Sequence, residues 1–430
     1  MPLDYPIVTR TLDNGLRVLV SPDHTVPTVT VNLWVGVGSR HERPGRTGLA
    51  HLFEHLMFQG SANVAEGEHF SLLMEHGGTL NATTWFDRTN YFETVPTGAM
   101  ELALWLEADR HGRLLAAVTQ ANLDNQRDVV KEEKRQRYDN QPYGTAIADL
   151  GSLVFPEAHP YHHPTIGSMD DLDAATLADV HAFYSAHYSP ANTVLTLVGD
   201  VDPEPGFAAV ERHFGPLRNP GPEAKLPSTQ LPPLVAAPRL DRIEQVPNDR
   251  LYLGFRLPVA HTAEFMACAV ALDAIGGLTT SRLYRRLVRT EEIATSVSGA
   301  SLGLVDGASL GFLGIDVAED ADPRSVEEAV CAELERFAVE GPTAAELESS
   351  LADTERSWLE ALAGHQERAD LMSHYTLLHD DPEHINTYLD SVRAVTSEQV
   401  QQAAVRWLLP DARATVAFAT DADQPSEVVA

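Results

Sequence analysis

The segment from residue 47 to residue 60 constrains this chain more than any other. Its apolar side chains recur at the helical spacing i, i+3, i+4, i+7 and i+8: Leu49, Leu52, Phe53, Leu56 and Met57. This periodicity predicts a helix with one buried face. Thr47 is the predicted N-cap, and Gly60 is the predicted stop after the last turn.

A second stripe of the same helix presents imidazole, carboxylate and imidazole from His51, Glu54 and His55. Two His residues four apart project from one helix face about one turn apart, so both can bind a single Zn²⁺ ion. Glu54 then lies beside the open position of the metal. Histidine pairs also occur in helices that hold no metal. However, a chance His-x-x-Glu-His match is expected only on the order of 0.05 times in a chain of this length, so we interpret the stripe as a zinc site.

Composition excludes several functional classes. The 430 residues include 62 acids and 31 Lys or Arg, which gives a formal net charge of -31. Such a surface repels nucleic acids and anionic membranes. The only cysteines are Cys268 and Cys331, too few for a disulfide framework or a Cys-based zinc site. The first residues do not resemble a signal peptide, and no apolar run reaches membrane-spanning length, so we expect a cytoplasmic protein.

Strand and helix patterns follow one another in both halves of the chain, and seven prolines lie between residues 216 and 238. We predict an α+β fold of two similar α/β sandwich halves, each a mostly antiparallel sheet packed by helices. The predicted parts are a zinc-bearing domain over 1–215, a Pro-rich linker over 216–240 and a second domain over 241–430. The second domain contains no His-x-x-Glu-His sequence.

Catalytic zinc normally takes three protein ligands, so a third must come from outside this helix. In a helix predicted from Asn122 to about Asp139, Glu133 falls on a half-apolar face, whereas Glu132 falls among charged neighbours. The other members of that face are Gln126, Val129 and Val130. This phase favours Glu133 as the third ligand. The sequence leaves two alternatives open: Glu133 pairs at the surface with Arg127 or Lys134, or the ligand is Glu75 or His76.

His51-Leu52-Phe53-Glu54-His55 is the inverted zinc-peptidase motif, and the chain resembles the family of insulysin, pitrilysin and the mitochondrial processing peptidase. The likeness covers nearly the whole chain, at the length of the small two-domain members. It is carried by residues 12–18, 48–55, 77–83, 89–91, 127–130, 133, 189–192, 199–200, 276–277 and 281–284.

The resemblance implies a zinc endopeptidase with one zinc ion per chain, held by His51, His55 and Glu133, with Glu54 as general base. It also implies that an extended peptide adds as a strand at three positions, which we predict to contact substrate: Asn81, Ala82 and Thr83. Peptide turnover and removal of a leader or presequence both fit. The rival interpretations are a non-catalytic structural subunit of the same fold and another type of zinc hydrolase.

Two departures from the family pattern bear on activity. Family members often have a second Glu seven residues before the ligand Glu, where this chain has Gln126. Because an amide can still form hydrogen bonds, we expect this difference to modify the activity and not to abolish it. Active full-length relatives carry an Arg and a Tyr in the second half, and Thr295 stands where the Tyr would be. The resemblance therefore predicts the zinc-bearing subunit of a homo- or heterodimer, with a zinc-less homologous partner favoured.

Overall fold

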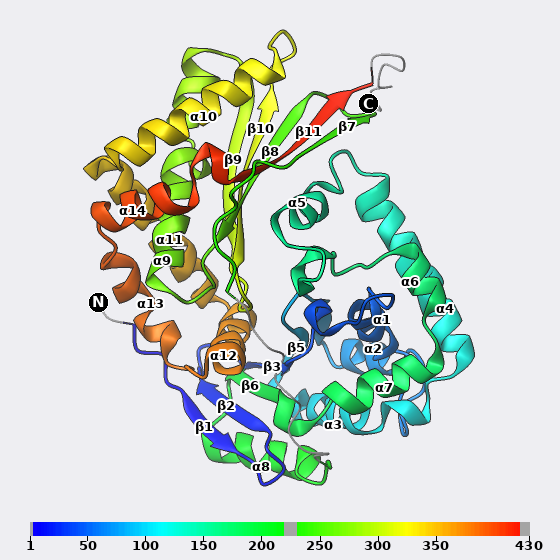
Figure 1. The fold of residues 1–430 in the computed structure, drawn as a ribbon. Helices are drawn as coiled ribbons and strands as arrows, with labels where there is room; N and C mark the ends of the chain where they lie inside the picture. Colours follow the sequence, from blue (N-terminus) through cyan, green and yellow to red (C-terminus); the bar gives the residue numbers. More distant parts are fainter. Residues whose placement is uncertain (1–2, 219–229, 422–430) are drawn as a thin grey trace. The chain divides into compact units, whose positions relative to one another are not determined.

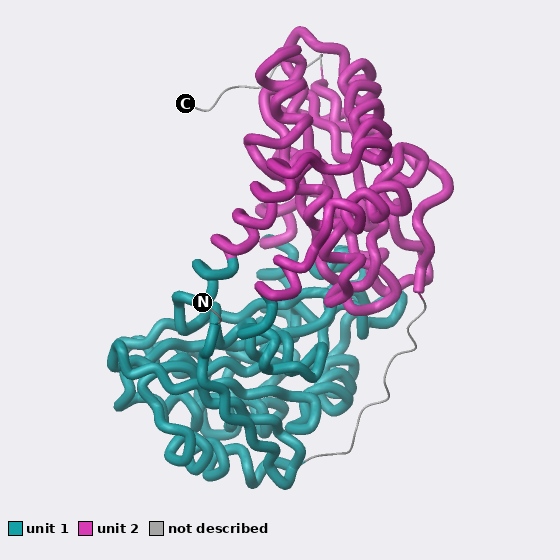
Figure 2. Tube along the Cα trace, turned by 90° about the vertical axis from the view of Figure 1, so that its left-hand side faces the viewer, with its two compact units in different colours: residues 1–132, 164–226, 358–388 teal, residues 133–163, 227–357, 389–430 magenta. Residues whose placement is uncertain are grey.

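The computed structural model describes residues 3–218 and 230–421, and the chain divides into two compact units (Figures 1 and 2). Unit 1 comprises residues 1–132, 164–226 and 358–388, and unit 2 the remainder. Each unit thus includes a segment from the opposite half of the chain. The domains predicted from the sequence follow the chain in order and do not include these exchanges. Part of the predicted linker, residues 219–229, lies outside the described residues.

Unit 1 is built on a six-stranded mixed sheet. In spatial order its strands are β1 (Val8–Thr11), β2 (Arg17–Pro22), β6 (Thr193–Gly199), β3 (Thr28–Val35), β5 (Thr89–Pro96) and β4 (Thr79–Thr84). The pair β2 and β6 is parallel, and the other neighbours are antiparallel. Strand β4 therefore lies at an edge, paired only with β5.

The central strand β3 is buried on both faces because helices cover both sides of the sheet. Val29, Val31 and Leu33 join one hydrophobic core, which α3 (Met100–Arg113) and α8 (Pro203–Phe214) complete. The alternate residues meet α12 (His365–His379): the indole N–H of Trp34 donates to Asp370 at 2.7 Å, and Asn32 donates to the same carboxylate. This two-residue alternation is what a strand between two layers requires.

Five further helices belong wholly or mainly to unit 1. They are α1 (Leu49–Leu56), α2 (Glu68–Glu75), α4 (Gln120–Lys134), α6 (Met169–Ala174) and α7 (Leu177–His187). Helices α1 and α2 both contact β4. The helix with the zinc-peptidase motif therefore lies next to an edge strand.

Unit 2 has a five-stranded sheet in the order β7 (Arg239–Glu244), β11 (Arg413–Thr420), β8 (Arg250–Leu257), β10 (Ser309–Val317) and β9 (Ala294–Leu302). Helix α5 (Ala146–Val154) packs on β8 and β11. The other principal helices are α9 (Ala263–Leu272), α10 (Pro323–Glu340) and α14 (Ser397–Trp407), and α11 (Ala344–Ala363) and α13 (His384–Arg393) belong to unit 2 only outside residues 358–388. Helices α9, α10 and α14 contribute to the main core of this unit.

The two sheets share one topology. In chain order, β2, β3, β4, β5 and β6 of unit 1 take the same places as β7, β8, β9, β10 and β11 of unit 2, and each sheet contains one parallel pair. Strand β1 is the addition in unit 1. The predicted fold of two similar, mostly antiparallel halves packed by helices is confirmed. Over residues 3–218 and 230–421, no helix has both the length and the apolar character that crossing a membrane requires.

Candidate active site

Helix α1 begins one residue later than predicted. Gly48 is its N-cap, with φ of 85°, a conformation that glycine adopts without strain. Thr47 does not cap the helix, because its hydroxyl and N–H both donate to Asp171. The first turn is capped by Glu42 instead, whose carboxylate accepts from the N–H groups of Gly48 at 2.9 Å and Ala50 at 2.7 Å. The helix ends at Leu56, four residues before the predicted stop at Gly60.

Sequence reasoning did not single out Glu42. Burial raises the pKa of its carboxyl to about 8, while the two backbone N–H bonds favour the charged form and act in the opposite direction. A carboxyl group at a helix N-terminus accepts from N–H groups that have no partner within the helix. Glu42 therefore fixes the start of α1, the helix that presents His51.

The apolar face of α1 is held by aromatic rings from α7 and from Tyr188, the residue that follows it. Phe53 is fully buried, and its ring lies 5.5 Å from Phe183 and 4.5 Å from Tyr188, centroid to centroid. Leu52 and Leu56 are also fully buried. Because this face of the helix is locked in the core, the stripe with the two imidazoles is held on the opposite side.

The structure brings His51, His55 and Glu133 together. Each offers one ligand atom, and the three atoms lie within 4.8 Å of one another. The two imidazole rings lie 4.8 Å apart at an angle of 78°. Two imidazoles and one carboxylate form a donor set used by catalytic zinc sites, so these residues fit the metal. The alternative ligands, Glu75 and His76, are exposed and do not belong to this group.

Glu133 lies on α4, which belongs to unit 1 as far as Glu132. The side chain of Glu133 is 18% exposed, whereas Glu132 is exposed, as the helical phase predicts. Gln126 and Val130 are buried on the same helix, but Val129 is 43% exposed, so the half-apolar face is narrower than predicted.

The ion pairs near Glu133 differ from those considered in the sequence. Its carboxylate lies 3.0 Å from the guanidinium of Arg137. Arg127 pairs with Asp124, and Lys134 pairs with Asp139. Arg137 is 73% exposed, so this pair contributes little to stability, and it leaves the choice of metal ligand unaffected.

The carboxylate of Glu54 accepts a hydrogen bond of 2.6 Å from the hydroxyl of Thr84, the last residue of β4. Burial lowers the pKa of Arg88, which lies in the turn that follows β4. The negative charges of Asp370 and Glu54 act in the opposite direction. Thr84 and Arg88 were not predicted as site residues. The alternation of residues along β4 does not indicate that the hydroxyl of Thr84 faces a side chain on another element.

Comparison with known proteins agrees with this geometry. The family pattern "Insulinase (Peptidase family M16)" matches residues 17–150, and the pattern "Peptidase M16 inactive domain" matches residues 174–352. Over 382 residues the chain is 30% identical to the zinc protease PqqE of Helicobacter pylori, covering 86% of this chain and 83% of that protein. The chain belongs to peptidase family M16.

Other relatives and solved structures are also similar to this M16 chain in sequence or in fold. An uncharacterized zinc protease of Mycobacterium leprae is 32% identical over 71% of this chain and 68% of its own length. The crystal structure of a protease from Helicobacter pylori superposes with a TM-score of 0.89 at 27% identity, covering 96% of this chain and 99% of that one. The periplasmic protease PqqL of Escherichia coli shares the fold, with a TM-score of 0.77, and this chain covers half of its length.

The predicted substrate positions of this M16 chain lie on edge strand β4. Asn81 is exposed, Ala82 is 8% exposed and Thr83 is partly buried. The backbone N–H of Ala82 donates to the side-chain oxygen of Asn81 at 2.9 Å. A local side chain thus satisfies a backbone donor of the edge strand, as expected where no further strand is paired.

In unit 2, Thr295 lies exposed on edge strand β9. Its hydroxyl is 3.5 Å from the carbonyl oxygen of Asp316, so it makes at most a weak bond. Helix α9, which has the place of α1 in the shared topology, carries neither His nor the motif. The zinc-peptidase motif therefore has no counterpart at the equivalent helix of unit 2.

Another group of residues with metal-binding side chains is buried in unit 1 and consists of His69, Glu93 and Glu107. Both carboxylate oxygens of Glu107 accept from the guanidinium of Arg110, which is itself 2% exposed. Burial, followed by the charge of Glu107, holds the pKa of the Glu93 carboxyl well above its ordinary range. A neutral Glu93 beside a Glu107–Arg110 pair is a charge-balanced structural cluster, so we do not assign it a metal.

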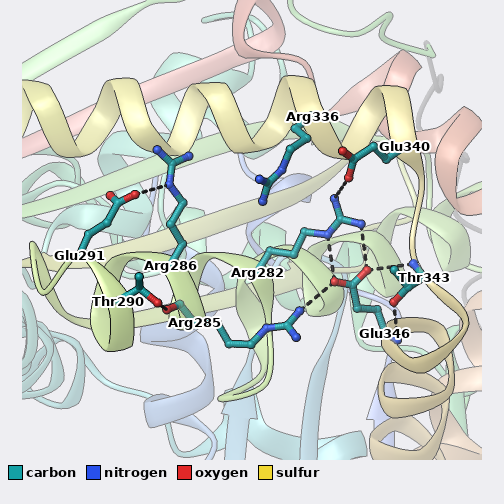
Figure 3. A pocket seen from close by; sticks show the side chains of 9 residues that line it. All are labelled: Arg282, Arg285, Arg286, Thr290, Glu291, Arg336, Glu340, Thr343 and Glu346. Atoms are coloured by element: carbon teal, nitrogen blue, oxygen red, sulfur yellow. Dashed lines mark hydrogen bonds and ion pairs between the residues drawn. The ribbon is translucent and has the colours of Figure 1, made fainter.

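Unit 2 contains a cavity of about 500 Å³ (Figure 3). Arg282 pairs there with Glu340 at 3.0 Å and Glu346 at 2.9 Å, and Arg286 pairs with Glu291. The further lining residues are Arg285, Thr290, Arg336 and Thr343. Arg336 pairs with Glu333, which is fully buried, so the four arginines are balanced by four glutamates. We interpret the charged residues that line this cavity as a structural ion-pair network that joins α10, α11 and the helix over 284–290.

Proposed function

We propose that this chain is a zinc endopeptidase that cleaves extended, unfolded peptides. The observation that carries the proposal is the convergence of His51, His55 and Glu133 within 4.8 Å, with Glu54 on the same helix and an edge strand beside it. The names of the M16 relatives support a zinc protease. The ligand set would hold one zinc ion per chain.

When bound, zinc lowers the pKa of a coordinated water and polarises the substrate carbonyl. Glu54 accepts the proton of the attacking water and later delivers it to the leaving amine. The hydrogen bond from Thr84 holds the carboxylate of Glu54 that would receive that proton. His51, His55 and Glu133 supply the donor atoms and perform no proton transfer.

Peptide binding would use the free edge of β4. An incoming strand at this edge would compete with Asn81 for the N–H of Ala82. Backbone pairing gives affinity without demanding one sequence, which suits extended peptides. It also disfavours folded substrates, whose backbone groups are already paired. We therefore place the peptide along Asn81, Ala82 and Thr83.

The test is the Glu54→Gln variant, which preserves size and removes the base. We expect zinc binding as in the wild type and loss of cleavage of an unstructured peptide, measured by mass spectrometry of the products. Glu132→Gln is the control, because Glu132 is exposed on α4. Full cleavage by Glu54→Gln would refute the role of Glu54. Hydrolysis of esters or small amides without peptide cleavage would indicate another zinc hydrolase.

We further propose that the active form contains two chains, with a partner of the same fold that lacks the zinc motif. Thr295 stands where the family resemblance expects a Tyr, and PqqL of Escherichia coli is twice as long as this chain. Light scattering of the purified chain, alone and with a candidate partner, tests this proposal. A stable, fully active monomer would contradict it. The cytoplasmic location predicted from the sequence stays a prediction.

A further inference from the structure

We infer that Thr84 is a positioning residue that couples the peptide-binding strand to the general base. The inference rests on the proposed function and deepens it. Thr84 ends the edge strand β4, and its hydroxyl lies 2.6 Å from an oxygen of Glu54. One side chain thus connects the strand to which a peptide would add with the carboxylate that would accept the proton.

The direction of this hydrogen bond follows from proton counting. Thr84 has a single hydroxyl proton, and its two neighbours of the right type are Glu54 at 2.6 Å and the hydroxyl of Thr89 at 3.4 Å. A carboxylate can only accept, so the short contact requires Thr84 to donate to Glu54. Thr89 directs its own proton to the carbonyl oxygen of Val37 at 2.8 Å. Charge-assisted bonds of this kind are the stronger ones.

The turn that follows β4 is held by several contacts. The turn after Thr84 is tied to the loop that leads to α1. The backbone N–H of Ser39 donates to the carbonyl oxygen of Trp85 at 3.1 Å, and the backbone N–H of Arg40 donates to the carbonyl oxygen of Phe86 at 3.0 Å. The guanidinium of Arg40 also lies 3.2 Å from the carboxylate of Asp87, which is 3% exposed.

The same loop continues to Glu42, which caps α1 through Gly48 and Ala50. One loop therefore braces both the end of the edge strand and the start of the helix with the base. This bracing holds the hydroxyl of Thr84 in register with Glu54. By contrast, Thr79 and Asn81, nearer the start of β4, are exposed and available to a peptide.

The test compares Thr84→Val, which keeps the shape and removes the donor, with Thr84→Ser, which keeps the donor. We expect Thr84→Val to lower kcat by about 10- to 100-fold, the loss typical of one hydrogen bond to a charged group. The KM for an unstructured peptide should stay within about twofold, since the contact acts on the base. Thr84→Ser should restore most of kcat. Thr94→Val, which removes the hydroxyl bonded to Thr30 on the neighbouring strands, is the matched control and should match the wild type.

Two further measurements separate positioning from folding. Zinc affinity should be the same for wild type and Thr84→Val. In the Glu54→Gln background, Thr84→Val should not change the anisotropy-measured affinity for a fluorescent peptide. Unchanged kcat in Thr84→Val, or an equal loss in Thr84→Ser, would overturn the inference. A crystal structure of the zinc-loaded wild type tests the hydrogen bond between Thr84 and Glu54 independently of any activity measurement. A Glu54 carboxylate turned away from Thr84 would overturn the inference, whereas failure of the wild type to cleave peptides counts against the proposed function alone.

Discussion

Replacing either of two neighbouring glutamates on α4 provides the sharpest test of the metal site. Glu132 and Glu133 are adjacent, so their side chains project about 100° apart around the helix. Glu133 is 18% exposed and shares a ligand group with His51 and His55, whereas Glu132 is exposed. Glutamine is similar in size to glutamate and has a similar helix propensity. The variants Glu133→Gln and Glu132→Gln therefore differ mainly in the direction of the altered group.

The expected magnitudes follow from the ligand count. Structural zinc sites with four ligands bind with about 10–16 kcal/mol, so one ligand accounts for roughly 3 kcal/mol. Losing the carboxylate of Glu133 should raise the zinc dissociation constant about 100- to 1,000-fold. Glu133→Gln also breaks the ion pair with Arg137, which is 73% exposed. An exposed pair contributes less than about 1 kcal/mol, so the metal-free variant should unfold with nearly wild-type stability.

The assay is competition for zinc with a chromophoric chelator, together with urea unfolding of the metal-free proteins. Glu132→Gln should retain the wild-type dissociation constant. A dissociation constant of Glu133→Gln within threefold of the wild type would refute Glu133 as a ligand. Equal losses in both variants would show that the charge of the helix, and not ligation, governs zinc affinity.

Two other predictions concern stability. Glu42→Ala leaves the N–H groups of Gly48 and Ala50 without their acceptor and should lower the free energy of unfolding by about 2 kcal/mol in urea titrations; an unchanged midpoint would show that Glu42 does not hold α1. Burial, followed by the charge of Asp353, raises the pKa of Asp273 to about 7. The folded state then keeps a proton that the unfolded chain releases above about pH 4, so stability should fall as the pH rises from about 4 to 7. Asp273→Asn should flatten this slope, and an identical pH profile in the variant would contradict the assignment.

The sequence by itself determined the local features of this protein. The apolar spacing of residues 49 to 57 is enough to predict α1, because helix periodicity depends only on neighbours along the chain. The phase of α4 likewise placed Glu133 inward and Glu132 outward. Both predictions rest on geometry that repeats every few residues, and the structure reproduces it. The N-cap was misplaced because Thr47 found an acceptor in Asp171, far along the chain.

Tertiary structure decided which distant groups meet. The capping of α1 by Glu42, the bond from Thr84 to Glu54 and the exchange of residues 133–163 and 358–388 between the units depend on long-range packing. The periodicity of the sequence does not indicate such partners, because only the fold brings these distant elements close together in space. The sequence therefore predicted which residues would hold a metal and accept a proton. The fold decided how those residues are oriented and held.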